Sequence, residues 1–402
     1  MKIIIAGAGI ACVSAIKAIR AQNKEIEITV YGEEPYYPYK RLRLTKDLAS
    51  GLEEQKLLIE KQAWYEENRI NLHTNKKMVG IDPDNRRVFL SDGTVDKYTN
   101  LLLANGASNA VLPIKGIDKK NVFTLRNLWN TGPILEQVKK SEDVLIIGGG
   151  ILGLEMAWSL TKLGRKATVV EALPRLMPRQ LDEEGSALLQ KIVEVHGVKV
   201  HTGSLVKEIT GGGQVDGFIT NKNLSQACDM VIHSTGISPN IQLVKDTGID
   251  TNRGILVNER METNLPHIYA AGDVAEFQGM TPGLWNVASL QGEIAGCNMA
   301  GLERTYAVPA VATVMNAFNY SMFSIGDIQG ESADLVLTQE VDENSYRKIV
   351  FREEKIIGAL FMGSIREFPA IKRGIESKAN FPEAYEKEME LSEFMLLLNE
   401  KR

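Results

Sequence analysis

The sequence has few cysteines and no long hydrophobic run, and each shortage excludes a class of protein. Its three cysteines, Cys12, Cys228 and Cys297, are too few and too scattered for a disulfide framework or a Cys-x-x-Cys site. No apolar stretch approaches the ~20 residues of a transmembrane helix. The first apolar residues run straight into a glycine turn, which is not typical of a signal peptide. We therefore expect a cytoplasmic protein without a membrane partner.

An excess of charge of one sign is also missing. The chain has 46 basic and 51 acidic residues, a net charge of -5 and no basic block, so nothing predicts a nucleic-acid surface. Its five histidines show no metal-ligand spacing, and any iron–sulfur centre would have to belong to a partner. With 402 residues, of which 44% are hydrophobic, the chain is long enough for two or three globular domains.

What the sequence does contain is two glycine-rich turns of the Gly-x-Gly-x-x-Gly type. Each follows an apolar strand, opens a helical pattern and precedes an acidic residue that comes about twenty positions later. The first copy has Gly7, Gly9, Cys12 and Glu33, and the second has Gly148, Gly150, Gly153 and Glu171. Glycines allow a tight turn close to a pyrophosphate, and the acid can accept a ribose hydroxyl. One such turn is weak evidence, but two complete units predict two bound dinucleotides.

The order of strands and helices predicts an α/β fold. Residues 1 to about 300 alternate strand and helix, which indicates two Rossmann-like domains with parallel sheets. Apolar strands end at Ala104-Asn105-Gly106 and at Gly236, where a backbone can cross close to a cofactor.

From residue 306 onward the pattern changes to short strands followed by helices, which predicts a small α+β domain. The expected strands are residues 308–315, 321–325, 333–338, 347–351 and 355–361, and a helix is expected over 367–377. The apolar tail, residues 391–398, reads as a helix that packs into the core, with a partner interface as the alternative.

The segment from Thr263 to Asp273, which ends Ala-Ala-Gly-Asp, adds a further signature. With it, residues 1–302 resemble the flavoproteins of the pyridine nucleotide-disulfide oxidoreductase family, whose fold is like that of glutathione reductase. The resemblance implies FAD at the first turn and NAD(P)H at the second. It also implies an FAD-binding domain of residues 1–108 and 242–305, an NAD-binding domain of residues 109–241, and a C-terminal domain of residues 306–402.

The resemblance carries over to particular residues of the FAD site. Asp273 would accept a ribityl hydroxyl and could also cap the next helix, and the helix beginning near Trp285 would face the flavin with its N-terminus. The implied FAD-site residues are Gly7, Gly9, Cys12, Glu33, Arg41, Lys46, Val79, Ala104, Asn105, Gly106, Gly272, Asp273 and Trp285. Cys12 stands where the family has glycine, and Asn105 where it has threonine. A slight widening is the simplest consequence at Cys12, with a reactive thiol as the alternative.

Residues 35–46 discriminate between branches of the family, because disulfide reductases carry a cysteine pair there and NADH oxidases or peroxidases a single cysteine. This chain has neither. Its Arg-x-x-Leu-Thr-Lys pattern, Arg41 to Lys46, is similar to that of rubredoxin and ferredoxin reductases and of nitrite reductase large subunits. In those proteins the lysine lies near the flavin. Electrons must then leave the flavin for an acceptor outside the chain.

In the second unit, Glu155 matches a family glutamate near the nicotinamide. Glu171 favours NADH, because a carboxylate repels the 2′-phosphate of NADPH, although Arg175 and Arg179 leave NADPH open.

We therefore predict an FAD-dependent NADH dehydrogenase, with Lys46 and Glu155 as catalytic residues, that reduces a rubredoxin- or ferredoxin-type protein. The basic run Lys40, Arg41, Arg43 and Lys46 would dock this acidic carrier. An NADH oxidase and a non-catalytic redox-sensing subunit are the alternatives, and the oligomeric state is open.

Overall fold

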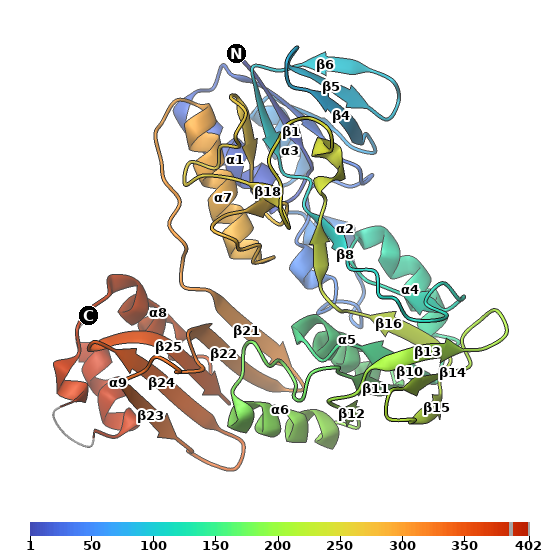
Figure 1. Ribbon diagram of the computed structural model, residues 1–402, viewed down its shortest axis with the longest axis vertical. Coiled ribbons are helices and arrows are strands. Elements are labelled where there is room, and N and C mark those ends of the chain that lie inside the picture. Colours follow the sequence, from blue (N-terminus) through green and yellow to red (C-terminus); the bar gives the residue numbers. More distant parts are fainter. Residues whose placement is uncertain (386–388, 401–402) are drawn as a thin grey trace. The chain divides into compact units, whose positions relative to one another are not determined.

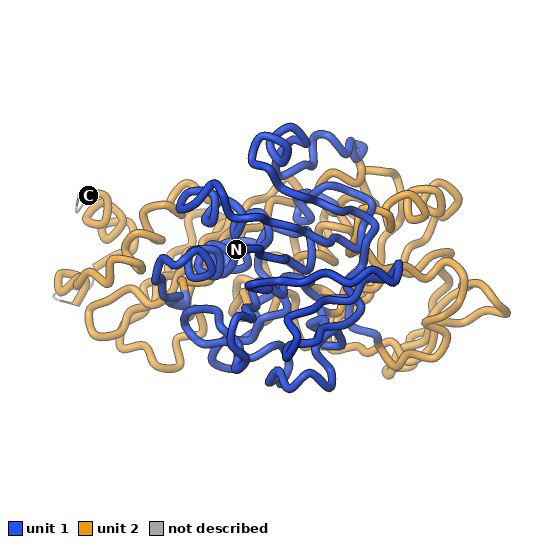
Figure 2. Tube along the Cα trace, turned by 90° about the horizontal axis from the view of Figure 1, so that it is seen from above, with its two compact units in different colours: residues 1–44, 50–111, 236–308 blue, residues 45–49, 112–235, 309–402 orange. Residues whose placement is uncertain are grey.

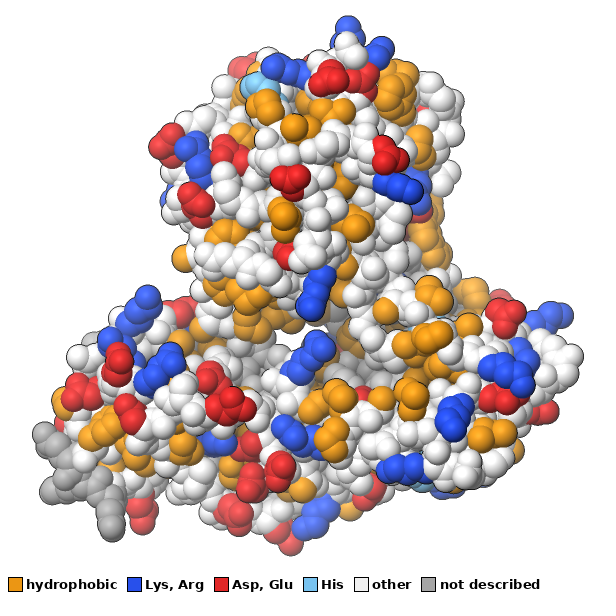
Figure 3. Space-filling view, viewed as in Figure 1, with side chains coloured by type: hydrophobic (Ala, Val, Ile, Leu, Met, Phe, Trp, Pro, Cys, Tyr) orange, Lys and Arg blue, Asp and Glu red, His pale blue; other side chains and the backbone are white. Residues whose placement is uncertain are grey.

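The computed structural model describes residues 1–385 and 389–400, which form two compact units (Figures 1 and 2). Unit 1 consists of residues 1–44, 50–111 and 236–308, and unit 2 of residues 45–49, 112–235 and 309–402. Over the part of the chain that is described, no helix is both long and apolar enough to cross a membrane. On the face drawn in Figure 3, acidic and basic side chains are interspersed, which agrees with the mixed charge of the sequence.

Unit 1 is built on a parallel five-stranded sheet of order β19-β7-β1-β2-β3. Its strands are β1 (Lys2–Ala6), β2 (Glu27–Tyr31), β3 (Ile70–His73), β7 (Asn100–Leu103) and β19 (Ile268–Ala270). Successive side chains of a strand point to opposite faces. Ile3 and Ile5 therefore pack with helices α1 (Ile10–Gln22) and α7 (Trp285–Met299), whereas Ile4 packs on the other face.

Smaller elements complete unit 1. They are α2 (Glu54–Leu57), α3 (Gln62–Glu67), η1 (Arg41–Arg43), η3 (Ile241–Val244), an antiparallel sheet of β4 (Met78–Asp82), β5 (Arg87–Leu90) and β6 (Val95–Lys97), and the strand pairs β8 (Ala107–Asn109) with β17 (Ile237–Pro239) and β18 (Ile255–Leu256) with β20 (Ala275–Glu276). The chain leaves unit 1 after β8 and returns to it just before β17.

Unit 2 repeats the same design. Its parallel sheet has the order β12-β11-β10-β16-β9. The strands are β9 (Val122–Phe123), β10 (Asp143–Ile147), β11 (Lys166–Val170), β12 (Lys199–His201) and β16 (Met230–His233), and the other elements are η2 (Leu128–Asn130), α4 (Thr131–Val138), α5 (Ile151–Lys162), α6 (Glu183–Val195), β13 (Val206–Thr210), β14 (Gly217–Thr220) and β15 (Ser225–Ala227). Ala6 pairs with Tyr31 in the first sheet as Ile147 pairs with Val170 in the second, so both predicted strand-turn-helix-strand units are confirmed.

The C-terminal part of unit 2 is an antiparallel sheet of order β21-β22-β25-β24-β23 with two helices packed on it. The elements are β21 (Ala312–Ala317), β22 (Tyr320–Gly326), β23 (Leu335–Gln339), β24 (Tyr346–Arg352), β25 (Lys355–Met362), α8 (Phe368–Ser377), η4 (Pro382–Ala384) and α9 (Leu391–Glu400). The first strand begins at Ala312 and not at residue 308 as predicted, since Pro309 has no amide hydrogen for a ladder. Leu391, Phe394 and Leu398 of α9 lie in the core, which confirms core packing for the tail.

Side chains of α5 and α6 join the C-terminal sheet to the rest of unit 2. Asp182 caps α6 by accepting the Gly185 amide at 3.0 Å, and its other oxygen accepts the Tyr346 hydroxyl and the Lys348 ammonium, each at 2.9 Å. The Phe318 ring at the β21–β22 turn lies 5.2 Å from that of Trp158. Both contacts are buried, so this sheet and α6 form one packed body within unit 2.

Candidate functional site

The first glycine turn lies between β1 and α1 of unit 1. Gly7 has a φ of +101°, and a Cβ atom there would stand 2.2 Å from the Ala104 carbonyl oxygen. Only glycine fits where these two backbones cross. Gly9 is the N-cap of α1 and has no side chain to occupy the first amides of the helix, which stay open to an anion. This cradle fits a dinucleotide pyrophosphate.

The second turn, between β10 and α5 of unit 2, has the same geometry. Gly148 has a φ of +111°, and its Cβ would lie 2.3 Å from the Ser234 carbonyl oxygen. Gly150 is the N-cap of α5, and a Cβ at Gly153 would lie 2.0 Å from the Gly148 oxygen. Contacts therefore require glycine at positions 148 and 153, and this turn too fits a pyrophosphate.

The third position of the motif distinguishes the two turns. Cys12 has no exposed surface and packs in the core with α7 and Tyr65. Burial raises the pKa of its thiol far above the ordinary value, so the alternative of a reactive Cys12 does not fit the structure. Close packing is provided by α7 instead, because Cβ atoms at Gly292 and Gly296 would lie 2.2 and 2.5 Å from oxygens of α1.

The acidic residues that follow the two glycine turns, Glu171 and Glu33, have different surroundings. Glu171 directly follows β11, and its carboxylate accepts the Gly149 amide at 2.6 Å and the Leu173 amide at 2.8 Å. Glu33 comes two residues after β2, is 54% exposed and pairs with Lys77 at 2.8 Å. Glu171 is thus fixed against its glycine turn, whereas Glu33 faces solvent.

Lys46 and Glu155, which the sequence placed at two different cofactors, meet in unit 2. Glu155 of α5 is 3% exposed, and one carboxylate oxygen accepts the Thr45 hydroxyl at 2.6 Å while the other lies 3.5 Å from Lys46 Nζ. Ser159, one turn further along α5, donates to the Thr45 carbonyl at 2.7 Å. Burial raises the pKa of Glu155, and Thr45 and Lys46 partly oppose that rise. The result is a buried carboxylate beside a partly exposed cation.

The remaining residues predicted for the FAD site lie in unit 1. Gly272 has a φ of +81° and precedes Asp273 after β19. Asp273 does not cap a helix, which corrects that prediction: the chain continues into β20, and α7 begins only at Trp285. Val79 of β4 is 55% exposed, which gives no sign of a binding role.

The connecting segments also carry predicted residues. Gly106 has a φ of +66° between β7 and β8, and Gly236 has a φ of +105° just before β17. Glycine adopts these left-handed conformations without strain.

The basic run does not present four free cations. The Arg41 guanidinium is hydrogen-bonded to Glu34 and lies over the Tyr39 ring, and Lys46 pairs with Glu155. Lys46 moreover belongs to unit 2, whereas residues 40–43 belong to unit 1.

Several polar residues were missed by the sequence analysis. Thr45 donates to Glu155 and Ser159 donates to the Thr45 carbonyl, and Thr45 was signalled only by its place beside Lys46. At the end of β16, His233 Nδ1 and Thr235 Oγ1 are buried without a hydrogen-bond partner among the described residues, and Asn105 Oδ1 is in the same state in unit 1. Burial lowers the pKa of His233, which keeps the ring neutral. Unpaired buried polar atoms beside both turns are compatible with a polar ligand.

Known proteins share these features. Residues 1–292 match the family described as pyridine nucleotide-disulphide oxidoreductase, and residues 312–379 match the rubredoxin NAD+ reductase C-terminal domain. The NADH-rubredoxin oxidoreductase of Clostridium acetobutylicum is 35% identical over 380 residues, which are 94% of this chain and 96% of that protein. The nitrite reductase (NAD(P)H) of Bacillus subtilis is 34% identical, over 95% of this chain and 48% of that protein, so the chain spans about half its length.

A solved structure agrees with these relatives. A ferredoxin reductase of Rhodopseudomonas palustris superposes with a TM-score of 0.90 at 26% identity, covering 98% of both chains. The fold, both glycine turns and both family matches lead to one conclusion: the chain belongs to the pyridine nucleotide-disulphide oxidoreductase family.

Proposed function

We propose that this protein takes electrons from NADH through FAD and delivers them to a separate iron protein of the rubredoxin or ferredoxin type. The observation that carries the proposal concerns the cysteines. All three are buried and unpaired, and the segment 35–46 contains none. No thiol of the chain is therefore available to take the electrons, and an external acceptor is required. The relatives named for rubredoxin and ferredoxin support this outlet.

FAD, when bound, supplies the chemistry that accepts a hydride and releases electrons one at a time. The chain supplies binding and orientation. We propose that the turn at Gly7 and Gly9, the crossing segment 104–106 and the Gly272-Asp273 pair bind FAD in unit 1. The second turn with Glu171 would bind NADH in unit 2, with the Glu171 carboxylate accepting the ribose hydroxyls.

The pair of Lys46 and Glu155 would place one cation and one anion at the nicotinamide-binding side of unit 2. The positive charge of Lys46 would favour electron-rich states of a ring bound nearby. Thr45 holds the Glu155 carboxylate in place beside Lys46. The domain bounds implied by the resemblance, a cytoplasmic location and docking of the acidic carrier by the part of the basic run that lies in unit 1, residues 40–43, belong to the same proposal.

An anaerobic titration tests the proposal. The purified protein should be yellow with one FAD per chain, and one equivalent of NADH should bleach the flavin. Turnover should then be at least tenfold faster with rubredoxin or ferredoxin than with oxygen. Faster turnover with oxygen would make the protein an NADH oxidase, and a colourless protein that cannot be reconstituted with FAD would exclude the dehydrogenase.

A further inference from the structure

Two asparagines form a reciprocal pair beside the first glycine turn. Asn105 Nδ2 donates to the Asn240 carbonyl oxygen at 2.8 Å, and Asn240 Nδ2 donates to the Asn105 carbonyl oxygen at 2.8 Å. The Asn240 amide also donates to the Gly106 oxygen at 3.0 Å, and the Ser108 hydroxyl donates to Asn240 Oδ1 at 2.7 Å. Each polar atom of the Asn240 side chain therefore forms a hydrogen bond.

This network determines how the Asn105 side chain is oriented. A carbonyl oxygen only accepts hydrogen bonds, so the atom that faces the Asn240 carbonyl must be Nδ2. Oδ1 is then the atom left over, and it is buried without a hydrogen-bond partner among the described residues. Leaving such an acceptor unpaired costs about 1–3 kcal/mol. A group held in this state in a native structure calls for an explanation, and a bound ligand is one.

The position of Asn105 indicates which ligand. Its Cα atom would be 2.8 Å from a Cβ atom at Gly7, so its backbone touches the turn that forms the first cradle. The family has a threonine at this place, whose side chain cannot form the same amide pair. The reciprocal pair therefore depends on asparagine at position 105, and it stands at the edge of the proposed FAD site.

We propose that Asn240 is a positioning residue for FAD: by its reciprocal bonds it holds Asn105 so that Oδ1 accepts a hydrogen bond from the cofactor. Ser108 supports Asn240 by fixing its amide. The inference rests on the proposed binding of FAD at the first turn.

FAD dissociation constants of the reconstituted protein test this role. Asn240→Ala should weaken FAD binding about five- to tenfold, the range of one lost hydrogen bond. Ser108→Ala should weaken it about twofold by freeing the amide. In an Asn105→Thr background, Asn240→Ala should change FAD affinity less than twofold, because its effect passes through Asn105. The visible circular dichroism of bound FAD should change in Asn240→Ala and Asn105→Thr alike.

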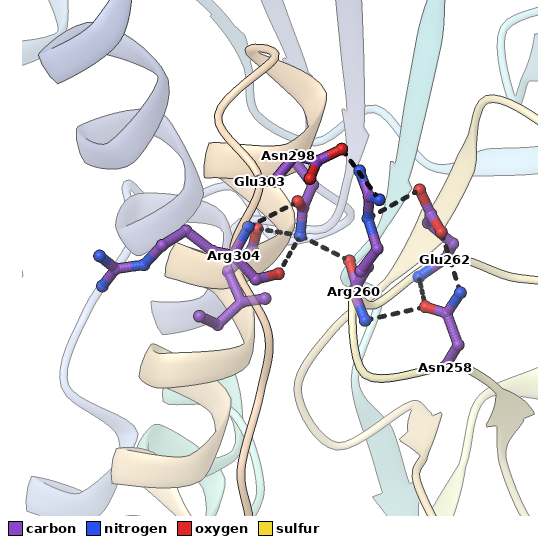
Figure 4. Close-up of polar contacts among 7 residues, drawn as sticks. Asn258, Arg260, Glu262, Asn298, Glu303 and Arg304 are labelled. Carbon is purple, nitrogen blue, oxygen red and sulfur yellow. Dashed lines mark hydrogen bonds and ion pairs between the residues drawn. The ribbon is translucent and has the colours of Figure 1, made fainter.

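Asn298→Ala is the matched control. Asn298 of α7 donates to the carbonyl oxygens of Ile294, Arg260 and Arg304 and accepts the Arg304 amide, so it makes more bonds than Asn240 (Figure 4). None of these partners lies at the glycine turn. Asn298→Ala should lower the melting temperature but leave FAD affinity and the dichroism within twofold of the unmodified protein.

Equal FAD affinity of Asn240→Ala and the unmodified protein would overturn the inference, as would an equal loss in Asn298→Ala. An equal effect of Asn240→Ala in both backgrounds would also overturn it. Failure of the unmodified protein to bind FAD would instead overturn the proposed function, so the two failures are distinguishable.

Discussion

At the residue scale, Glu155 is a charged residue in a setting unlike water. It has one strong hydrogen bond, from Thr45, and its cation Lys46 is 3.5 Å away and 35% exposed. A carboxylate taken out of water is stabilised by such partners only in part, which explains why the net direction of its pKa is upward. This residue therefore makes the folded protein sensitive to pH.

The first prediction concerns Glu155→Gln. Because the folded pKa lies above the ordinary 4.5, the folded protein holds this proton more tightly than the unfolded chain. The stability gained from this proton is fully present below about pH 4.5. It is lost as the pH rises through the pKa that Glu155 has in the folded protein. Glutamine does not titrate, so the variant should gain about 1–3 °C over the unmodified protein at pH 8 and little at pH 4.5.

Melting curves of both proteins at the two pH values measure this. Glu27→Gln, at an exposed glutamate of unit 1, is the control and should show no such difference. A larger gain for Glu155→Gln at pH 4.5 than at pH 8 would contradict the sign argued here.

The second prediction concerns the choice of coenzyme. Removing the negative charge of Glu171 by Glu171→Gln should lower the ratio of kcat/KM for NADH to that for NADPH about tenfold, since repulsion of the 2′-phosphate is lost. Steady-state kinetics with each coenzyme check this. Glu33→Gln changes the corresponding residue of the other turn and should leave the ratio unchanged. An unchanged ratio in Glu171→Gln would exclude Glu171 from the ribose site.

At the element scale, the contact of α6 with β24 depends on one buried ion pair. The side chains of Asp182 and Lys348 are 9% and 11% exposed. Removing one member of such a pair leaves a buried charge and costs about 3–5 kcal/mol. We expect Asp182→Ala to cost about this much, in part through the lost helix cap. The double variant with Lys348→Met should recover about 1 kcal/mol or more, because no charge is then left unpaired.

Urea unfolding of the two single variants and the double variant measures these free energies. Lys348→Met alone should be milder than Asp182→Ala, because Tyr346 and the Gly185 amide still bond to Asp182. If the losses of unfolding free energy in the two single variants simply add in the double variant, the two residues do not interact.

Most elements could be predicted from the sequence, because both glycine units combine a continuous apolar strand with a helical pattern. The strand that precedes each glycine turn, for example, agrees with the prediction. The contacts between residues distant in sequence could not be predicted. Nothing in a pattern of residue types indicates that Thr45 would bond to Glu155 or Asn105 to Asn240, since these pairs depend on tertiary packing. The helix-cap role of Asp273 was wrong for the same reason: a carboxylate after a strand is compatible with a cap, but a further strand follows.

At the scale of the whole molecule, each compact unit contains one complete glycine turn. The fourth prediction belongs to this scale and uses hydrogen exchange of the apoprotein with and without each dinucleotide. FAD should protect residues 7–12 and 104–106 of unit 1, and NAD+ should protect residues 148–153 and 171–173 of unit 2, because a ligand slows opening of the amides that it contacts. Protection of residues 7–12 by NAD+ alone would contradict the assignment.

The pairing of β8 with β17 has a consequence for synthesis. Unit 1 obtains β19 and α7 only from residues that follow segment 112–235. On the ribosome, where chains emerge at about 5–20 residues per second and domains tend to fold as units, the parallel sheet around β10 can form while the one around β1 still lacks an edge strand and a covering helix. Of the two glycine turns, the one made first is thus finished second, and until then one edge of its sheet stays unpaired.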